Sequence, residues 1–221
     1  MTNDRLEVFA RDFAKKIQHL LNTTICTGIN LNSVVRRPGT GIIAHKLQKK
    51  QLRSEPLPVR RGKGKPHCYL DLSYTFCWDE TQEYPTVQSS FFALVAPDKE
   101  RTLLCHLDYE RDKADGYPEA HVQVHGDSPA LNAWPAAQGR PLSKLHFPVG
   151  GRRYRPILED VIEFLAAEKL VPALAPGAEE IIKAGREEFR VIQLRAAIRR
   201  DPDTALRALR DFGKIPRDGP P

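Results

Sequence analysis

The chain has 221 residues, 41% hydrophobic and 28% charged, a balance typical of a folded globular protein and not of a disordered one. Its longest apolar run is far shorter than the ~20 residues that a membrane span needs, and its N-terminus lacks the apolar core and cleavage site of a secretory signal. The net charge is +6. We expect a cytoplasmic protein with one domain over 1–221 and no membrane partner.

An N-terminal helix is predicted over 1–22, because apolar residues recur there at helical spacing and form a single stripe. The following segment, 23–66, is rich in Pro, Gly and basic residues that interrupt regular structure. We therefore expect 23–66 to be a flexible basic arm, with room for a short helix around 41–53.

The positive charge is concentrated in this arm. Between Arg36 and Lys65 ten bases stand against one acid, Glu55, which gives this stretch +9 and leaves −3 for the rest of the chain. Such a segment suits the phosphate backbone of RNA or DNA, whereas base stacking is not expected because few aromatic residues interleave with the charges. The residues predicted to contact phosphates are Arg36, Arg37, Lys49, Lys50, Arg60, Arg61, Lys63 and Lys65. The alternative is that they form an ordinary solvated loop.

The clearest pattern in the sequence predicts an antiparallel sheet over 67–147. Apolar and polar residues alternate with period two through 67–78, as in a strand with one buried face. Short polar turns separate further strands, which are expected at 87–95, 102–110 and 121–125, with a short one at 144–147. Helices must cover the apolar face. The predicted fold class is therefore α+β, an antiparallel β-meander of four to five strands packed by N-terminal and C-terminal helices.

The C-terminal part, 148–221, is predicted to be helical. Helices are expected at about 157–169, at 178–199 and at 202–212, the last opened by the Asp201-Pro202 pair. If the protein is an interaction module, the helices after 176 are the predicted contact surface for a protein partner, and the arm becomes ordered on that partner. The apolar residues divided between core and interface would be Ile181, Phe189, Ile192 and Leu206.

The four cysteines do not indicate a metal site. Cys26, Cys68, Cys77 and Cys105 form no CxxC pair, and three of them fall in predicted strands, where a free thiol behaves as a small apolar side chain. We predict reduced thiols and neither a metal nor a cofactor.

A first candidate site lies on the hairpin formed by the third and fourth predicted strands. With its turn near 114–115, the register places Asp108 opposite His121 and His106 opposite Gln123, all on the polar face. A carboxylate beside an imidazole prepares a general base. His106 and His121 are thus candidate catalytic acid and base for RNA cleavage, with Asp108 orienting His121. The alternative is that these residues form the solvated face of an ordinary antiparallel sheet.

A second candidate site is the loop before the first C-terminal helix. Gly150 and Gly151 allow backbone N–H groups to converge, and the loop leads into a helix N-terminus, which favours an anion. Three arginines crowd the same end, so the predicted phosphate-binding set is Gly150, Gly151, Arg152, Arg153 and Arg155. Pairing of the arginines with Glu159, Asp160 or Asp108 inside the fold is the alternative.

Two stretches carry a resemblance to known sequences. YPEAHVQVHG (117–126) followed by LHFPVGGRRYRPILEDVIEFL (145–165) resembles an uncharacterised actinobacterial family of about this length, over most of 67–211. That family implies no activity. A sheet with histidines on its later strands is also similar to the TumE-like toxins of toxin–antitoxin pairs, which are smaller and have a fuller histidine-rich ending. No catalytic residue is carried over from them.

Two functions are consistent with these features. The first is a protein that binds the phosphate backbone of nucleic acid, with an RNase-like toxin or defence component as its catalytic form. The second is a non-enzymatic regulatory or antitoxin-like interaction module. The sequence leaves open whether the protein is an enzyme.

Overall fold

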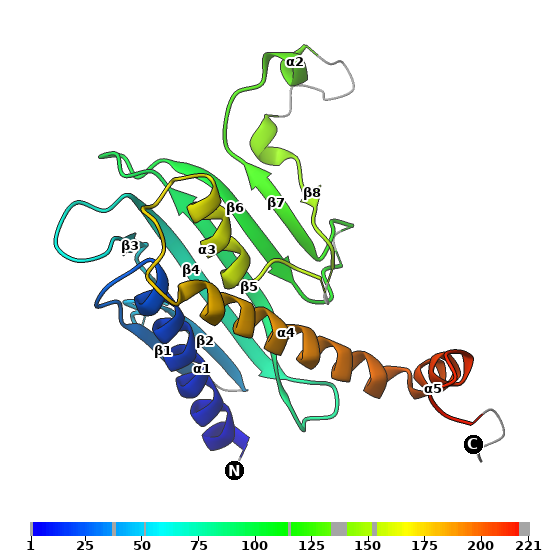
Figure 1. Cartoon of the computed structure of the whole chain (residues 1–221). Coiled ribbons are helices and arrows are strands. Elements are labelled where there is room, and N and C mark those ends of the chain that lie inside the picture. The colour runs from blue at the N-terminus through cyan, green and yellow to red at the C-terminus, as the bar shows by residue number, and fades with distance from the viewer. Residues whose placement is uncertain are drawn as a thin grey trace. The chain divides into compact units, whose positions relative to one another are not determined.

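The computed structural model describes residues 2–36, 39–50, 52–114, 116–133, 141–151 and 154–216 (Figure 1). The chain divides into two compact units, Met1–Glu179 and Glu180–Pro221. The first contains the sheet and the helices that cover it, and the second contains helical residues. The single domain expected over 1–221 stays a prediction.

The first unit is built on an eight-stranded sheet in which every pairing is antiparallel. Its order is β1-β2-β4-β5-β6-β7-β8, with β3 also paired to β4. The α+β class and the antiparallel sheet are confirmed, but the sheet has more than the four to five strands expected. The strands are β1 Leu31–Arg36, β2 Thr40–His45, β3 Leu57–Val59, β4 Cys68–Trp78, β5 Pro85–Val95, β6 Leu103–Glu110, β7 Ala120–Val124 and β8 Phe147–Pro148.

Strand β4 pairs with three other strands, β2, β3 and β5. Its residues alternate between buried and half-buried along its whole length, as the period-two pattern predicts. It pairs with β5 in a register that sets Leu72 opposite Phe92 and Trp78 opposite Pro85. We call the face that carries Leu72 and Phe76 the helix face. The opposite one, with Asp71 and Ser73, is the second face.

Helix α1, Thr2–Thr24, lies on the helix face (Figure 1). The rings of Phe9 and Phe13 meet Phe76 edge-on at centroid distances of 5.3 and 5.1 Å. Phe13 also meets Tyr74 edge-on at 5.2 Å. Edge-to-face contacts of this kind add to the apolar burial that holds a helix on a sheet.

The segment predicted as a flexible arm with a short helix holds three strands instead. The helix expected around 41–53 is wrong, because β2 occupies Thr40–His45 and pairs with β4 through Ile43 and Tyr74. Ile43, Leu57 and Val59 are fully buried. The apolar, mostly β-branched residues of these short strands are buried or half-buried in the sheet, while Pro and Gly fall largely in the connections between them.

After β7 the chain leaves the sheet, returns to pair with β7 through β8, and then forms helix α3. After α2, Pro129–Asn132, it forms a 3₁₀ turn at Leu142–Lys144 and then β8, so the strand expected at 144–147 is only Phe147–Pro148. Helix α3, Leu158–Ala167, begins where the Asp160 carboxylate accepts a 2.9 Å hydrogen bond from the backbone N–H of Ile157. An acid in the first turn also suits the positive end of the helix dipole.

The second unit consists of most of α4, Ala178–Arg200, and of α5, Pro202–Asp211. Asp201 caps α5 by accepting a 3.0 Å hydrogen bond from the Thr204 N–H, with Pro202 at the first helical position as expected. No helix in the described part of the chain is both long enough and apolar enough to cross a membrane. Large apolar side chains remain exposed on both helices: Ile192, Leu194, Ile198, Leu206, Leu209 and Phe212.

Candidate functional site

The hairpin of β6 and β7 has the register expected from the sequence. Asp108 pairs with His121 and His106 with Gln123. The His121 residue is buried, and its Nε2 atom lies 3.9 Å from Oδ2 of Asp108. The predicted carboxylate–imidazole neighbours are therefore close together on the second face of the sheet.

Both nitrogens of His121 face protein groups. Nδ1 lies 3.3 Å from the carbonyl oxygen of Pro118, which can only accept, so Nδ1 carries a proton. Nε2 is directed toward Asp108. The Asp108 side chain is 28% exposed against 2% for His121, so the carboxylate is the accessible member of the pair. The catalytic roles assigned to His106, Asp108 and His121 stay predictions.

Gln123 fixes the hydrogen-bond directions around His106. Its Nε2 amide donates to the carbonyl of Ser143 at 3.0 Å, which leaves Oε1 as the acceptor. Oε1 accepts from Nε2 of His106 at 2.6 Å, so His106 carries a proton on that nitrogen. The Gln123 amide also lies 3.1 Å from Nε2 of His146, which then acts as an acceptor.

The other nitrogen of His106 is buried without a hydrogen-bond partner, as is Nε2 of His125. The two rings are 5.5 Å apart between centroids. Burial lowers the pKa of His106 below its ordinary value, with the hydrogen bond to Gln123 and the charge of Asp108 opposing that shift. His106 is therefore best suited to the neutral form near neutral pH.

Two further aromatic residues of this face were not singled out from the sequence. The ring of His146 lies 4.6 Å from that of His121 and 4.1 Å from that of Tyr117. Pro148 pairs with His121 in the ladder, and His146 precedes it by two residues, so both point to the second face. The sequence does show a histidine two residues before Pro148. Its place beside His121 depends on the pairing of β8 with β7, and a two-residue strand is too short to be predicted from sequence.

Arg155 lies on the opposite face of the sheet from this cluster. Its guanidinium is 4.3 Å from the centroid of Tyr109, and the residue is 9% exposed. Tyr109 follows Asp108 along β6, so their side chains point to opposite faces. Glu159 is buried in the same region, where burial and then its charge raise the pKa of Tyr74. The structure thus does not bring Arg155 together with His106 and His121.

The glycines of the predicted phosphate loop differ from each other. Gly150 has a positive φ of 63°, and a Cβ atom there would lie 2.5 Å from the carbonyl oxygen of Tyr154. Gly151 accepts a 2.9 Å hydrogen bond from the Tyr154 N–H and has open space around it. Gly150 therefore allows a close backbone approach. Arg152 and Arg153 lie outside the described residues, and the phosphate site stays a prediction.

Of the predicted nucleic-acid residues that the structure describes, Arg36 ends β1 and the others lie in the connections after β2 and β3. These three strands are on one side of β4. We call the described members the basic edge: Arg36, Lys49, Lys50, Arg60, Arg61, Lys63 and Lys65. Arg37 lies outside the described residues. Arg36 reaches the carbonyl of Lys49 at 3.5 Å, and Arg60 donates to that of Gly64 at 2.7 Å. All except the half-buried Arg60 are exposed.

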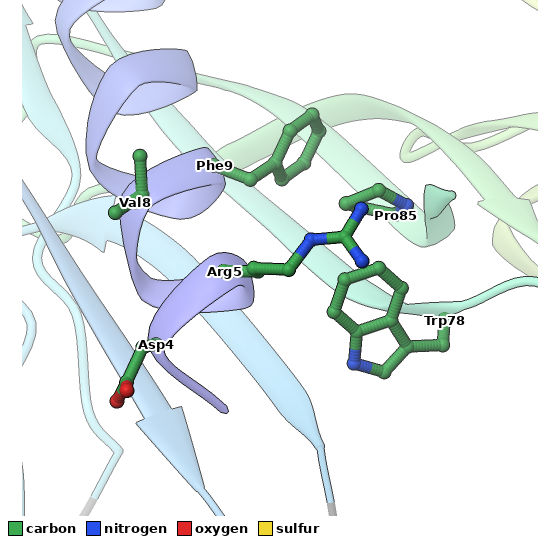
Figure 2. A pocket seen from close by; sticks show the side chains of 6 residues that line it. All are labelled: Asp4, Arg5, Val8, Phe9, Trp78 and Pro85. Carbon is green, nitrogen blue, oxygen red and sulfur yellow. The ribbon is translucent and has the colours of Figure 1, made fainter. Parts of the chain in front are cut away.

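A pocket of about 390 Å³ lies between the start of α1 and the β4–β5 hairpin (Figure 2). The Arg5 guanidinium lies over the Trp78 ring at 5.3 Å, and its Nη2 reaches the carbonyl of Glu83 at 3.4 Å. Sequence reasoning missed this site because residues 4–9 and 78–85, which form its two walls, are far apart in the chain. The residues that line it are Asp4, Arg5, Val8, Phe9, Trp78 and Pro85.

The fold and these sites define an α+β protein with a large antiparallel sheet. No protein-family model, curated protein or solved structure matches the chain. The resemblance to an actinobacterial family and to TumE-like toxins stays a prediction. Within the described residues, no three His, Cys, Asp or Glu side chains are placed to hold one metal ion.

Proposed function

We propose that this protein binds the phosphate backbone of nucleic acid through the basic edge. The observation that carries the proposal is that these basic residues, all exposed except the half-buried Arg60, have no carboxylate partner in the part of the chain that the structure describes. Among the described residues of 36–65, Lys46 is the one base paired with a carboxylate, that of Glu55 at 2.7 Å. Exposed cations without acidic neighbours bind phosphates by releasing condensed counterions, and this mode needs no base reading.

The strands behind the basic edge support its use as a surface. Lys49 and Lys50 lie in the β2–β3 connection, and the bases from Arg60 to Lys65 lie in the β3–β4 connection. β2 and β3 pair with the same strand, β4, on the side opposite β5. Paired strands thus fix both ends of the connections that carry these cations, so less entropy is lost on binding than with a disordered arm.

The experiment is a salt series with duplex DNA. Arg61, Lys63 and Lys65 are exposed in one loop, so their replacement by Ala removes charge without touching the core. If each contacts a phosphate, the triple variant should bind more weakly at low salt. The slope of the logarithm of the association constant against that of salt should fall by about 2.7. Deletion of 36–65 is unsuitable, because it would remove β2 and β3.

A matched control removes the same charge elsewhere. Lys99, Lys183 and Arg195 are exposed and lie far from 36–65 in sequence. Their triple replacement by Ala should leave the salt slope near that of the unmodified protein. Equal losses in both variants would mean that net charge alone attracts the nucleic acid, and the basic edge would lose its special role.

The proposal stops at binding and includes no cleavage step. His121 faces protein groups through both nitrogens, and Arg155 lies on the other side of the sheet. Cleavage by the His106–Asp108–His121 group is a separate hypothesis. That hypothesis predicts that the unmodified protein cleaves RNA, and that the Asp108→Asn variant still binds nucleic acid but no longer cleaves it.

The second candidate function is that of a protein-interaction module, and one observation favours it. Exposed apolar side chains extend along α4 and α5, with Phe212 79% exposed. On α5, Leu206 and Leu209 share one face with Phe212, because they are separated by three residues each. An apolar stripe of this kind is typical of helices that dock into a partner.

A photo-crosslinking residue at position 209 tests this candidate. It should capture one discrete protein in the native host, and the same crosslink should disappear when Leu206 and Phe212 are replaced by Ser. A crosslink that survives both replacements would count against the helix face as the contact.

A further inference from the structure

We infer that the pocket between α1 and the β4–β5 hairpin binds an unpaired base of single-stranded nucleic acid, with Trp78 as the stacking surface and Arg5 as the phosphate ligand. The inference rests on the proposed function and narrows it to single strands. It also revises an expectation from the sequence. Few aromatic residues lie among the basic residues of 36–65, so stacking of nucleic-acid bases on the protein was not expected. The fold supplies those aromatics from α1 and from the end of β4.

Trp78 is a rigid platform. Its side chain belongs to the helix face at the end of β4 and is 9% exposed. Phe9, on the neighbouring wall, is held edge-on against Phe76 at 5.3 Å. Aromatic rings that are fixed before binding lose little conformational entropy when a base stacks on them. The pocket volume of about 390 Å³ lies in the range of small-ligand sites.

Arg5 marks the place of the ligand. Its planar cation covers the Trp78 ring at 5.3 Å, farther than close stacking, and its hydrogen bond to the exposed Glu83 carbonyl is long, at 3.4 Å. A base can therefore take the position over the ring while Arg5 turns to the adjoining phosphate. A guanidinium suits both positions, because it stacks on rings and pairs with phosphate oxygens in a bidentate way.

The pocket adjoins the basic edge. Gly39, in the β1–β2 turn, is so close to the indole that a Cβ atom there would lie 3.4 Å from Cδ1 of Trp78. Arg36 ends β1 at the same turn and reaches toward Lys49. A strand with one base on Trp78 can thus continue along Arg36 and Lys49, the members of the basic edge at this end of β4.

The acidic residues near the pocket set the direction of that path. Figure 2 shows the Asp4 carboxylate pointing away from the Trp78 ring. Asp79, in the turn after Trp78, is occupied internally, because Oδ1 accepts from the backbone N–H groups of Glu83 and Tyr84 at 3.0 and 3.1 Å. Glu80 and Glu83 remain exposed in that turn. They repel phosphates there and favour a route toward Arg36.

An unpaired base is required by the geometry of stacking. In a duplex both faces of each base are covered by neighbours, so a duplex reaches Trp78 only if a base leaves the stack. A single strand offers free faces, and stacking on one aromatic side chain tightens binding by roughly 5- to 150-fold. The pocket therefore predicts preference for single strands over duplexes of equal length, which the basic edge alone does not produce.

Fluorescence of Trp78 provides the test. The chain has two tryptophans, so Trp134→Phe makes Trp78 the sole indole reporter. Titration of this variant with oligo-dT should quench its emission, and a duplex of the same length should bind more weakly with little quenching. Arg5→Ala should lose at least fivefold in single-strand affinity and keep its duplex affinity, whereas Arg11→Ala, an exposed change on the same helix, should match the parent.

The outcomes separate this inference from the proposed function. Salt-dependent binding with equal affinity for single strands and duplexes, and no response of Trp78, would overturn the pocket and leave the basic edge in place. Absence of any binding at low salt would overturn both. Because Trp78→Ala removes core packing, the conservative Trp78→Phe is the second variant, and it should retain most of the single-strand preference through its smaller ring.

Discussion

At the scale of single residues, Gln123 sets the directions of the hydrogen bonds on the second face of the sheet. A side-chain amide has one donor end and one acceptor end, and the Ser143 carbonyl decides which is which. Gln123 thereby holds His106 at 2.6 Å and positions His146 beside it. The sequence predicts the pairing of His106 with Gln123, because strand alternation and a hairpin turn determine it. It does not predict His146, whose position depends on a two-residue strand.

Replacement of Gln123 by Ala should destabilise the protein. The change leaves the half-buried His106 without its acceptor and the Ser143 carbonyl without its donor. The free energy of unfolding should fall by about 1–3 kcal/mol, measured by urea denaturation. Gln48→Ala, at an exposed site, is the matched control and should stay within about 0.5 kcal/mol of the parent.

The low pKa of His106 predicts a pH dependence of stability. Burial holds the folded-state pKa below the ordinary value of 6.5, so the unfolded chain takes up this proton first as the pH falls. The stability is fully present above about pH 6.5 and declines at lower pH, because the unfolded state then binds more protons.

Substitution by Gln at His106 tests this dependence. Between about pH 7 and pH 5 the stability of His106→Gln should fall less than that of the parent, whereas His19→Gln, at an exposed histidine, should follow the parent curve. An NMR titration in which His106 has a pKa at or above 6.5 would contradict the prediction. Asp108, His121 and His125 also influence this group and should be followed in the same spectra.

At the scale of elements, the sequence predicts the long strands from their alternating pattern and the start of a helix from its cap. It does not predict the short strands. The period-two pattern locates β4 to within a residue, and Asp201-Pro202 locates the start of α5. β1, β2 and β3 were missed because each is only three to six residues long and lies among Pro, Gly and basic residues. β2 and β3 are buried by pairing with β4, and β1 joins the sheet by pairing with β2. These are tertiary interactions that local propensity does not encode.

The turn before α3 gives a test at this scale. Gly150→Ala should lower the free energy of unfolding by more than about 1 kcal/mol, because the residue has a positive φ and its new Cβ would meet the Tyr154 carbonyl. Gly151→Ala is the control one residue away. A Cβ atom there has nothing within 4 Å, so the change should be small. Equal effects in thermal denaturation would show that the turn tolerates a side chain at both positions.

At the scale of the whole molecule, the pocket that sequence reasoning missed is built from distant segments of the chain. Trp78 and Arg5 meet only because α1 lies across β4, and Arg155 is separated from His121 because adjacent residues of β6 face opposite ways. The sequence contains the residues of both groups, but their distances follow from helix docking. That docking depends on the complete core and not on any local pattern.

The cysteines report on the integrity of this core. Burial raises the pKa of Cys26 to about 12 and that of Cys68 to about 11, and both side chains are almost fully covered. Iodoacetamide at pH 8 should therefore label them only when the sheet opens, at a rate that rises steeply with urea. Mass spectrometry should find the half-buried Cys77 and Cys105 labelled before Cys26 and Cys68. Equally fast labelling of Cys26 in native buffer would mean that α1 detaches locally.

The two edge strands of the sheet, β1 and β8, differ in the backbone hydrogen-bonding groups that another chain could pair with. β8 has two residues, and one of them, Pro148, has no backbone N–H with which to bind a neighbouring strand. Extension of the sheet by further strands, the first event in strand swapping and fibril growth, is therefore disfavoured at β8 and directed to β1. Truncation or mutation that loosens the β8 pairing would expose β7 and raise the tendency of the protein to aggregate.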